Sequence, residues 1–126
     1  MQERAEVPVL FVRASGGPAG APGAFEKLES RLPTLRRRKF FATCRGADYR
    51  ACVKLEEDDD PEAWGLEVGV IPGGVYAKRR LDGGPRDIAP TFDAMAREFP
   101  QDTSRPCIEF YRRHDDVVLF LPVVAD

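Results

Sequence analysis

The chain has 126 residues, of which 43% are hydrophobic, 10% aromatic and 32% charged. These values are typical of one globular domain, because domains cluster near about 100–150 residues and disordered chains carry fewer apolar side chains. The net charge of −2 argues against a general nucleic-acid binder, which usually carries a strong positive excess.

The sequence also lacks the usual signs of a membrane, secreted or metal-binding protein. No apolar run approaches the roughly 18 residues of a membrane span, and the N-terminus lacks a secretory signal. The cysteines Cys44, Cys52 and Cys107 show no C-x-x-C spacing, and the single histidine, His114, leaves too few soft ligands for an ordinary zinc site. We therefore expect a reduced cytoplasmic protein without cofactors, in which the cysteines act as small apolar side chains.

The first half of the chain, residues 7–55, reads as a strand, a helix and two further strands. Phe25, Leu28 and Leu32 are spaced i, i+3, i+7, which predicts an amphipathic helix that Pro33 ends. In chain order the predicted elements are a strand at 7–13, a Gly-Gly-Pro turn at 16–18, a helix at about 23–32, and strands at 39–45 and 49–55.

An acidic segment, 56–66, links this half to a second one, residues 67–123. We interpret the acidic run as a solvated connector, because like charges repel, and the basic run 36–39 as its counterweight on the surface. Asp87 can cap the second helix and Pro100 ends it. The predicted elements are a strand at 67–81 interrupted at 72–74, a helix at about 88–99, and hairpin strands at 106–112 and 116–123.

The two halves match without a gap when the sequence is shifted by 67 residues. Residues 8–55 and 75–122 share nine identities in 48 positions, concentrated at turns and helix ends. We interpret this match as an internal duplication. The sequence therefore predicts one α+β domain over 1–126, built from two pseudo-twofold-related strand–helix–strand–strand modules, with an antiparallel sheet and the helices on one face.

The strand at 106–112 departs most from its counterpart. Because side chains alternate along a strand, Cys107, Glu109 and Tyr111 share one face. Ile108 and Phe110 share the other face, and we expect them to pack on the helices. Glu109 is then expected on the helix-free face, either solvated or paired with an arginine, or as a pocket carboxylate that attracts cations or acts as a base.

Two further aromatic residues differ between the halves. Tyr76 stands opposite a valine at the 67-residue offset, and Trp64 has no counterpart. Together with Tyr111 they could form an aromatic box around Glu109, which favours flat cationic ligands, and Phe40 could line the same groove. Aromatic residues on a sheet are also common in ordinary cores. Core positions are expected for Phe41, Phe92, Phe99 and Phe120.

The order and spacing of several short stretches resemble the GyrI-like small-molecule-binding family, the effector-binding domain of BmrR-type multidrug-responsive regulators. These stretches are 39–44, 49–52, 71–77, 105–111 and 119–123. The resemblance covers about 7–123 and implies a pocket between two modules, in which Glu109 meets lipophilic cations and Tyr76 and Tyr111 stack on them. Regulators of the family carry a helix-turn-helix domain ahead of this one. Since this chain begins at the first strand, we expect a stand-alone member that does not bind nucleic acid directly.

These observations support one leading function and two alternatives. The leading hypothesis is binding of hydrophobic, often cationic small molecules for sensing or sequestration, by a monomer or homodimer. Its ligand-binding residues would be Glu109, Tyr111, Tyr76, Trp64, Phe40 and Cys107. The first alternative is a hydrolase that opens cyclopropane rings of DNA-alkylating natural products, with Glu109 activating water. The second is a protein-interaction inhibitor of the gyrase-inhibitor type, whose acidic 56–62 run imitates nucleic-acid charge.

Overall fold

A computed structural model describes residues 1–113 and 115–125, so His114 lies outside the described residues. Eight strands form one antiparallel sheet in the order β1-β6-β8-β7-β3-β4-β2-β5. The strands are β1 (Gln2–Arg4), β2 (Val7–Arg13), β3 (Phe40–Arg45), β4 (Asp48–Lys54), β5 (Glu67–Ile71), β6 (Gly74–Arg80), β7 (Cys107–Arg113) and β8 (Asp116–Pro122). The α-helices are α1 (Ala21–Arg31), α2 (Pro61–Trp64) and α3 (Ile88–Glu98).

Each half of the chain contributes the same succession of elements. β2, α1, β3 and β4 come from the first half, and β6, α3, β7 and β8 from the second. Corresponding elements begin 67 residues apart: β2 and β6 at Val7 and Gly74, and β3 and β7 at Phe40 and Cys107. The sheet order is symmetric about the β3·β7 pair, where the two halves meet. This arrangement is the expected α+β architecture, while the internal duplication stays a prediction.

Both long helices form where the apolar spacing predicts them. Leu28 of α1 and Met95 of α3 are fully buried against the sheet. The helices end at residues 31 and 98, before Pro33 and Pro100, because proline cannot extend the hydrogen-bond ladder. Asp87 does not cap α3 with its side chain as expected. Its carboxylate instead accepts the backbone N–H of Gly84 at 2.9 Å, which closes the turn before the helix.

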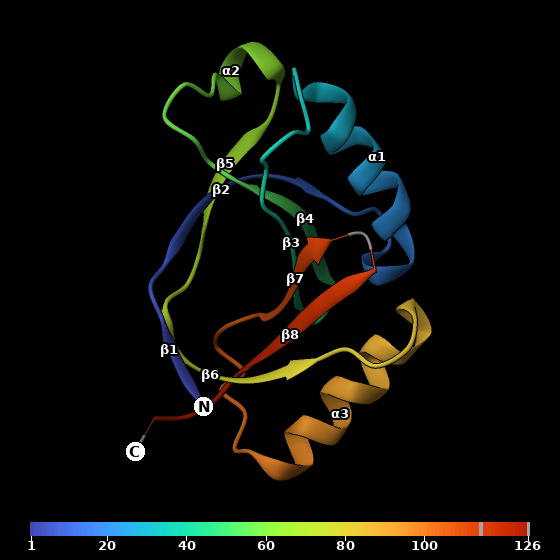
Figure 1. Ribbon diagram of the computed structural model, residues 1–126, viewed down its shortest axis with the longest axis vertical. Helices are drawn as coiled ribbons and strands as arrows, with labels where there is room; N and C mark the ends of the chain where they lie inside the picture. The colour runs from blue at the N-terminus through green and yellow to red at the C-terminus, as the bar shows by residue number, and fades with distance from the viewer. Residues whose placement is uncertain (114, 126) are drawn as a thin grey trace.

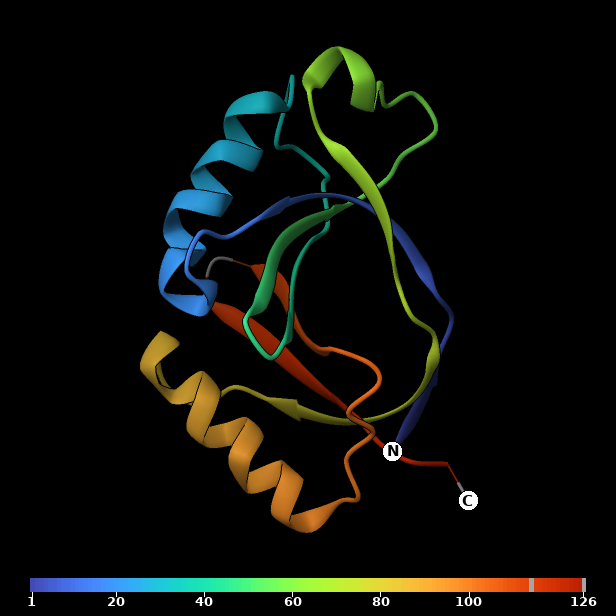
Figure 2. The same cartoon turned by 180° about the vertical axis from the view of Figure 1, so that it is seen from behind.

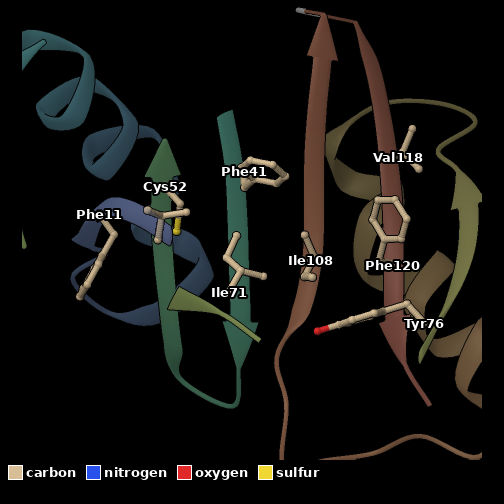
Figure 3. Close-up of a cluster of buried hydrophobic side chains, with 9 residues drawn as sticks. Phe11, Phe41, Cys52, Ile71, Tyr76, Ile108, Val118 and Phe120 are labelled. Atoms are coloured by element: carbon tan, nitrogen blue, oxygen red, sulfur yellow. The ribbon is translucent and has the colours of Figure 1, made fainter. Parts of the chain in front are cut away.

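The curled sheet is buried on both faces. α1 and α3 cover one face, which we call the helix face, and both views show them on the same side of the sheet (Figures 1 and 2). The other face, which we call the inner face, curls around an apolar cluster of its own (Figure 3). This cluster consists of Val9, Phe11, Phe41, Cys52, Ile71, Tyr76, Ile108, Val118 and Phe120.

The segment 56–66 is more structured than a solvated connector. Arg38 binds both carboxylate oxygens of Asp59 at 2.7 and 2.8 Å, and their side chains are only 9% and 5% exposed. Asp60 caps α2 by accepting the N–H of Ala63 at 3.1 Å. Arg38 of the basic run therefore pairs with Asp59 of the acidic run, and the side chains of this ion pair are buried rather than on the surface.

Two features at the edges of the fold complete the description. β1 was not predicted from the sequence, and it pairs with β6 at one edge of the sheet. The predicted interruption at 72–74 separates β5, the strand at one edge of the sheet, from β6, the second strand from the other edge. Within the described part of the chain, no helix has the length and apolar character needed to cross a membrane.

Candidate functional site

Glu109 lies at the centre of the seam between the two halves. It is in the middle of β7, opposite Ala42 of β3 and Leu119 of β8, and it is only 4% exposed. A buried carboxylate is costly unless hydrogen bonds or an opposite charge offset its lost hydration. Glu109 therefore needs specific partners.

Two tyrosines donate hydrogen bonds to the same carboxylate oxygen. The Tyr49 hydroxyl donates to Oε1 of Glu109 at 3.1 Å, and the Tyr111 hydroxyl donates to Oε1 through a short hydrogen bond. Among the described residues, both hydrogen bonds to this carboxylate go to Oε1, and none goes to Oε2. Glu109 also lines the adjoining cavity.

The buried setting shifts the pKa values of Glu109, Tyr49 and Tyr111. Burial raises the pKa of Glu109, although the hydrogen bonds from Tyr111 and Tyr49 act in the opposite direction. Burial and the neighbouring carboxylate raise the pKa of Tyr49 and of Tyr111 well above the usual range. Both phenols therefore stay protonated and act as hydrogen-bond donors at neutral pH.

A cavity of about 330 Å³ adjoins Glu109 on the helix face. Its floor includes Glu109 and Tyr49, and α3 contributes the apolar side chains of Ile88 and Phe92 to its wall. Arg105 also borders the cavity, but its guanidinium is already engaged. It binds Asp102 at 3.0 Å, donates to two backbone carbonyls at 2.8 and 3.1 Å, and lies 4.7 Å from the centre of the Tyr76 ring. Glu109 is thus a buried carboxylate of a partly apolar cavity, which Arg45 and the exposed Asp93 also line.

A second cavity of about 200 Å³ lies on the inner face. It is lined by Thr43, Cys52 and Ile71, together with the side chains of Arg45 and Arg50 near the β3–β4 turn. Arg50 is paired with Asp48 at 3.0 Å. Of the two cavities, the one on the helix face contains the buried carboxylate, so we take it as the candidate site.

The expectation that Glu109 lies on the helix-free face is wrong. Ile108 belongs to the inner-face cluster with Phe110 packed against it, whereas Cys107 and Tyr111 pack with the apolar cluster under α3. The alternation along β7 was predicted correctly, but the assignment of its two sides was inverted. The physical reason is the curl of the sheet, which gives the inner face an apolar interior without any helix.

The structure brings some of the predicted site residues together and separates others. Tyr111 and Cys107 lie on the same face as Glu109, and Tyr111 contacts it directly. Phe40 faces Tyr111 across the strands but packs with the cluster under α1. Trp64 also packs with that cluster.

Tyr76 lies on the inner face, away from the carboxylate. Its hydroxyl donates to the carbonyl oxygen of Pro72 at 2.6 Å, and its ring meets Phe120 edge-on at 6.4 Å between centroids. The predicted aromatic box around Glu109 is therefore absent among the described residues, because two of its three members are elsewhere.

Tyr49 and Phe92 are among the site residues that the sequence reasoning missed. Tyr49 pairs with Cys44 in the β3–β4 hairpin, and that register places it on the helix face beside Glu109. Reading the hairpin outward from its turn would have found it. Phe92 was expected in an ordinary core, but its side chain lines the cavity.

Comparisons with known proteins give similarity in fold but not in sequence. Neither a protein-family model nor a curated protein matches the chain. Three solved structures match over 98% of it. The structure of SAV2435 bound to tetraphenylphosphonium has a TM-score of 0.60 and 11% identity, over 92% of that chain. A hydrolase from Listeria innocua has a TM-score of 0.61 and 13% identity, over 89% of its chain.

The third is a putative bacterial transcription regulation protein from Staphylococcus aureus MU50, with a TM-score of 0.59 and 10% identity over 96% of its chain. At such identities the three likenesses show the fold alone. The chain therefore has an α+β fold consistent with a GyrI-like domain, and its structural neighbours include a ligand-bound protein and a regulator-like one.

Proposed function

We propose that this chain is a GyrI-like small-molecule-binding domain that takes up lipophilic cations in the helix-face cavity, with Glu109 as the counter-charge. The observation that carries the proposal is the geometry of Glu109. Two tyrosines hold one carboxylate oxygen, the other oxygen accepts no hydrogen bond from the described residues, and Glu109 lines a partly apolar cavity. Sensing and sequestration are both roles that such binding would serve.

Electrostatics favour a cationic ligand at this position. A buried carboxylate has lost much of its hydration, so a cation entering the cavity restores an interaction that water no longer supplies. Ile88 and Phe92 provide apolar area worth on the order of 25 cal/mol per Å² buried. The cavity volume is at the lower end of the roughly 300–1,000 Å³ of ligand sites, which favours a compact ligand.

One structural neighbour supports this choice of ligand. SAV2435, which shares the fold, is described as bound to tetraphenylphosphonium, a cation with an apolar surface. We propose that the same class of compound binds here, and that the multidrug character implied by the family resemblance applies to this chain.

Calorimetric titration tests the proposal with tetraphenylphosphonium and, as a neutral partner of related shape, triphenylphosphine oxide. Glu109→Gln is expected to weaken binding of the cation at least about tenfold, since it removes the charge and keeps the size. Binding of the neutral compound should change little. Glu29→Gln, an exposed position on α1, is the matched control and should leave both affinities unchanged. Equal losses for both compounds in Glu109→Gln would contradict the electrostatic role.

A hydrolase is the second candidate function. Burial raises the pKa of Glu109, which suits a general base, and one structural neighbour is described as a hydrolase. Glu109 would accept a proton from water as the water oxygen bonds to a cyclopropane carbon. The electrons of the broken ring bond would pass to the remaining substrate, which takes up the proton. Incubation with a cyclopropane-bearing alkylating agent should then yield a water adduct by mass spectrometry, and Glu109→Gln should abolish it.

The gyrase-inhibitor type of function stays a prediction. Within the acidic run, Asp59 is buried in its pair with Arg38, so this carboxylate does not contribute to an exposed acidic surface.

A further inference from the structure

Three cross-strand pairs form a row on the helix face of the β3·β7 seam. They are Phe40 with Tyr111, Ala42 with Glu109, and Cys44 with Cys107. The aromatic end of this row is covered by Phe25 of α1, whose ring meets Tyr111 edge-on at 5.4 Å between centroids. The cysteine end borders the cavity, and both thiols line it. The open part of the site therefore carries a pair of facing thiols beside Glu109.

The register places Cys44 and Cys107 directly opposite each other, at a Cβ spacing suited to a bridging atom between their thiols. The N–H of Lys54 bonds to the carbonyl of Lys39, so odd-numbered residues of β3 bond to β4 and even-numbered ones bond to β7. Cys44 and Cys107 are therefore a hydrogen-bonded pair, with Cα atoms about 5.5 Å apart. Such pairs hold their Cβ atoms farther apart than the roughly 3.5–4.5 Å of a disulfide. One atom inserted between the sulfurs fits this spacing better than a direct S–S bond.

The environment of Cys44 and Cys107 disfavours reactions that require one of them as a thiolate. Burial raises the pKa of Cys107 to about 12, and Cys44 and Glu109 add to the shift. Burial and Glu109 likewise raise the pKa of Cys44. Both cysteines are free and only partly exposed. At neutral pH they are protonated thiols, which react slowly with alkylating agents because the thiolate is the nucleophile.

We propose that Cys44 and Cys107 form a dithiol site for trivalent arsenicals of the type R–As(OH)₂. Arsenic binds both sulfurs and keeps its bond to carbon, which completes three-coordination. Two As–O bonds break and two As–S bonds form, each thiol proton leaves with a hydroxide as water, and no oxidant or reductant is required. The apolar R group would lie against Ile88 and Phe92 in the cavity.

Two observations favour this class over a simple metal ion. Soft sulfur ligands select soft, thiophilic centres. Among the described residues no group of three or more potential ligands gathers as a metal site, so an ion that requires three or four protein ligands is poorly served. An organic arsenical requires only the two sulfurs. The inference uses the cavity of the proposed function but does not depend on Glu109 binding a cation.

Phenylarsine oxide, which hydrates to the required diol, is the probe. The reduced protein is incubated with it, and intact mass spectrometry should show one phenylarsenic group per chain with loss of two thiol hydrogens. Titration of thiols in denaturant should fall from three to one, since the chain has three cysteines. Cys44→Ala and Cys107→Ala should each weaken binding by about 100-fold, because the second attachment becomes unavailable. Cys52→Ala, on the inner face, is the matched control and should bind as the parent does.

Circular dichroism confirms that each variant is folded before binding is compared. If the arsenic is attached to both sulfurs, a small 1,2-dithiol should release the phenylarsenic group from the protein, and a monothiol should not. Equal binding by the parent and Cys44→Ala, or no mass gain at all, would overturn the inference. Glu109→Gln should keep the arsenical while losing tetraphenylphosphonium, so failure of one proposal is distinguishable from failure of the other.

Discussion

Tyr49 and Glu109 are 60 residues apart in the chain, yet the phenol of one donates to the carboxylate of the other at 3.1 Å. They come from β4 and β7, with β3 between them. At this level β3 presents Ala42 and Cys44, whose small side chains leave room for the tyrosine to reach across. The hydrogen bond thus joins the two halves of the domain at the base of the cavity.

Removing this hydrogen bond should change the pH dependence of cation binding. Binding requires ionised Glu109, so affinity rises as pH rises through the pKa of the carboxyl group. The Tyr49 hydroxyl lowers that pKa, so Tyr49→Phe should raise it and move the midpoint of binding to higher pH. The measurement is the dissociation constant for tetraphenylphosphonium over a pH series. Tyr76→Phe removes a hydroxyl on the inner face and should leave the midpoint unchanged.

Glu109 should also shape the pH dependence of stability. Its pKa is higher in the folded than in the unfolded chain, so its contribution is fully present below the unfolded pKa and is lost as pH rises through the folded pKa. At neutral pH, Glu109→Gln is expected to raise the free energy of unfolding relative to the parent, because it removes the charge that burial disfavours. Urea denaturation from acidic to neutral pH checks this. A variant less stable than the parent across the whole range would contradict it.

The buried pair of Arg38 and Asp59 should be important for stability. The Arg38 guanidinium holds the pKa of Asp59 below its usual range, so the stabilisation is present above the unfolded pKa and is lost as pH falls through the folded one. Asp59→Asn leaves a buried guanidinium uncompensated and should cost about 3 kcal/mol in urea denaturation near neutral pH. Asp58→Asn, at the adjacent exposed position, should cost less than about 0.5 kcal/mol.

The apolar wall of the cavity should contribute to affinity through Phe92. Phe92→Leu removes contact area with the ligand and is expected to weaken tetraphenylphosphonium binding by about three- to tenfold. Tyr76→Leu makes the matching change on the inner face and should leave the affinity of the folded protein within about twofold of the parent. Calorimetric titration of both variants with tetraphenylphosphonium measures the two affinities. A larger loss in Tyr76→Leu would restore Tyr76 to the site, as the sequence alone suggested.

The two long helices and the succession of strands along the chain could be predicted because they follow from local rules. The i, i+3, i+7 spacing in α1 and the prolines at 33 and 100 predict the ends of both helices to within two residues of those observed. The 67-residue correspondence then indicates which strands play equivalent roles in the two halves. β1 and α2 are three and four residues long, and segments of that length carry too little periodicity to be recognised.

The candidate site was predicted only in part, because alternation shows which residues share a face but not what covers that face. Glu109, Tyr111 and Cys107 were correctly grouped on one side of β7. Ile108 and Phe110 were expected to pack against the helices because their side chains are apolar. A curled sheet, however, can bury such side chains against other strands on its inner face. The β3–β4 hairpin places Tyr49 on the face of Cys44, but its contact with Glu109 also depends on the pairing of β3 with β7, a strand 60 residues further along the chain.

The pairing of Ala42 with Glu109 limits how many charges the seam can hold. Positions 42 and 109 occupy equivalent places in the two halves and face each other directly. A second acid at position 42 would set two carboxylates side by side in a region that water barely reaches, and their repulsion would oppose ionisation of both. With a methyl group on one side, this cross-strand pair carries one carboxylate, that of Glu109. Under the proposed function, saturation of that carboxylate would therefore correspond to one cation per polypeptide.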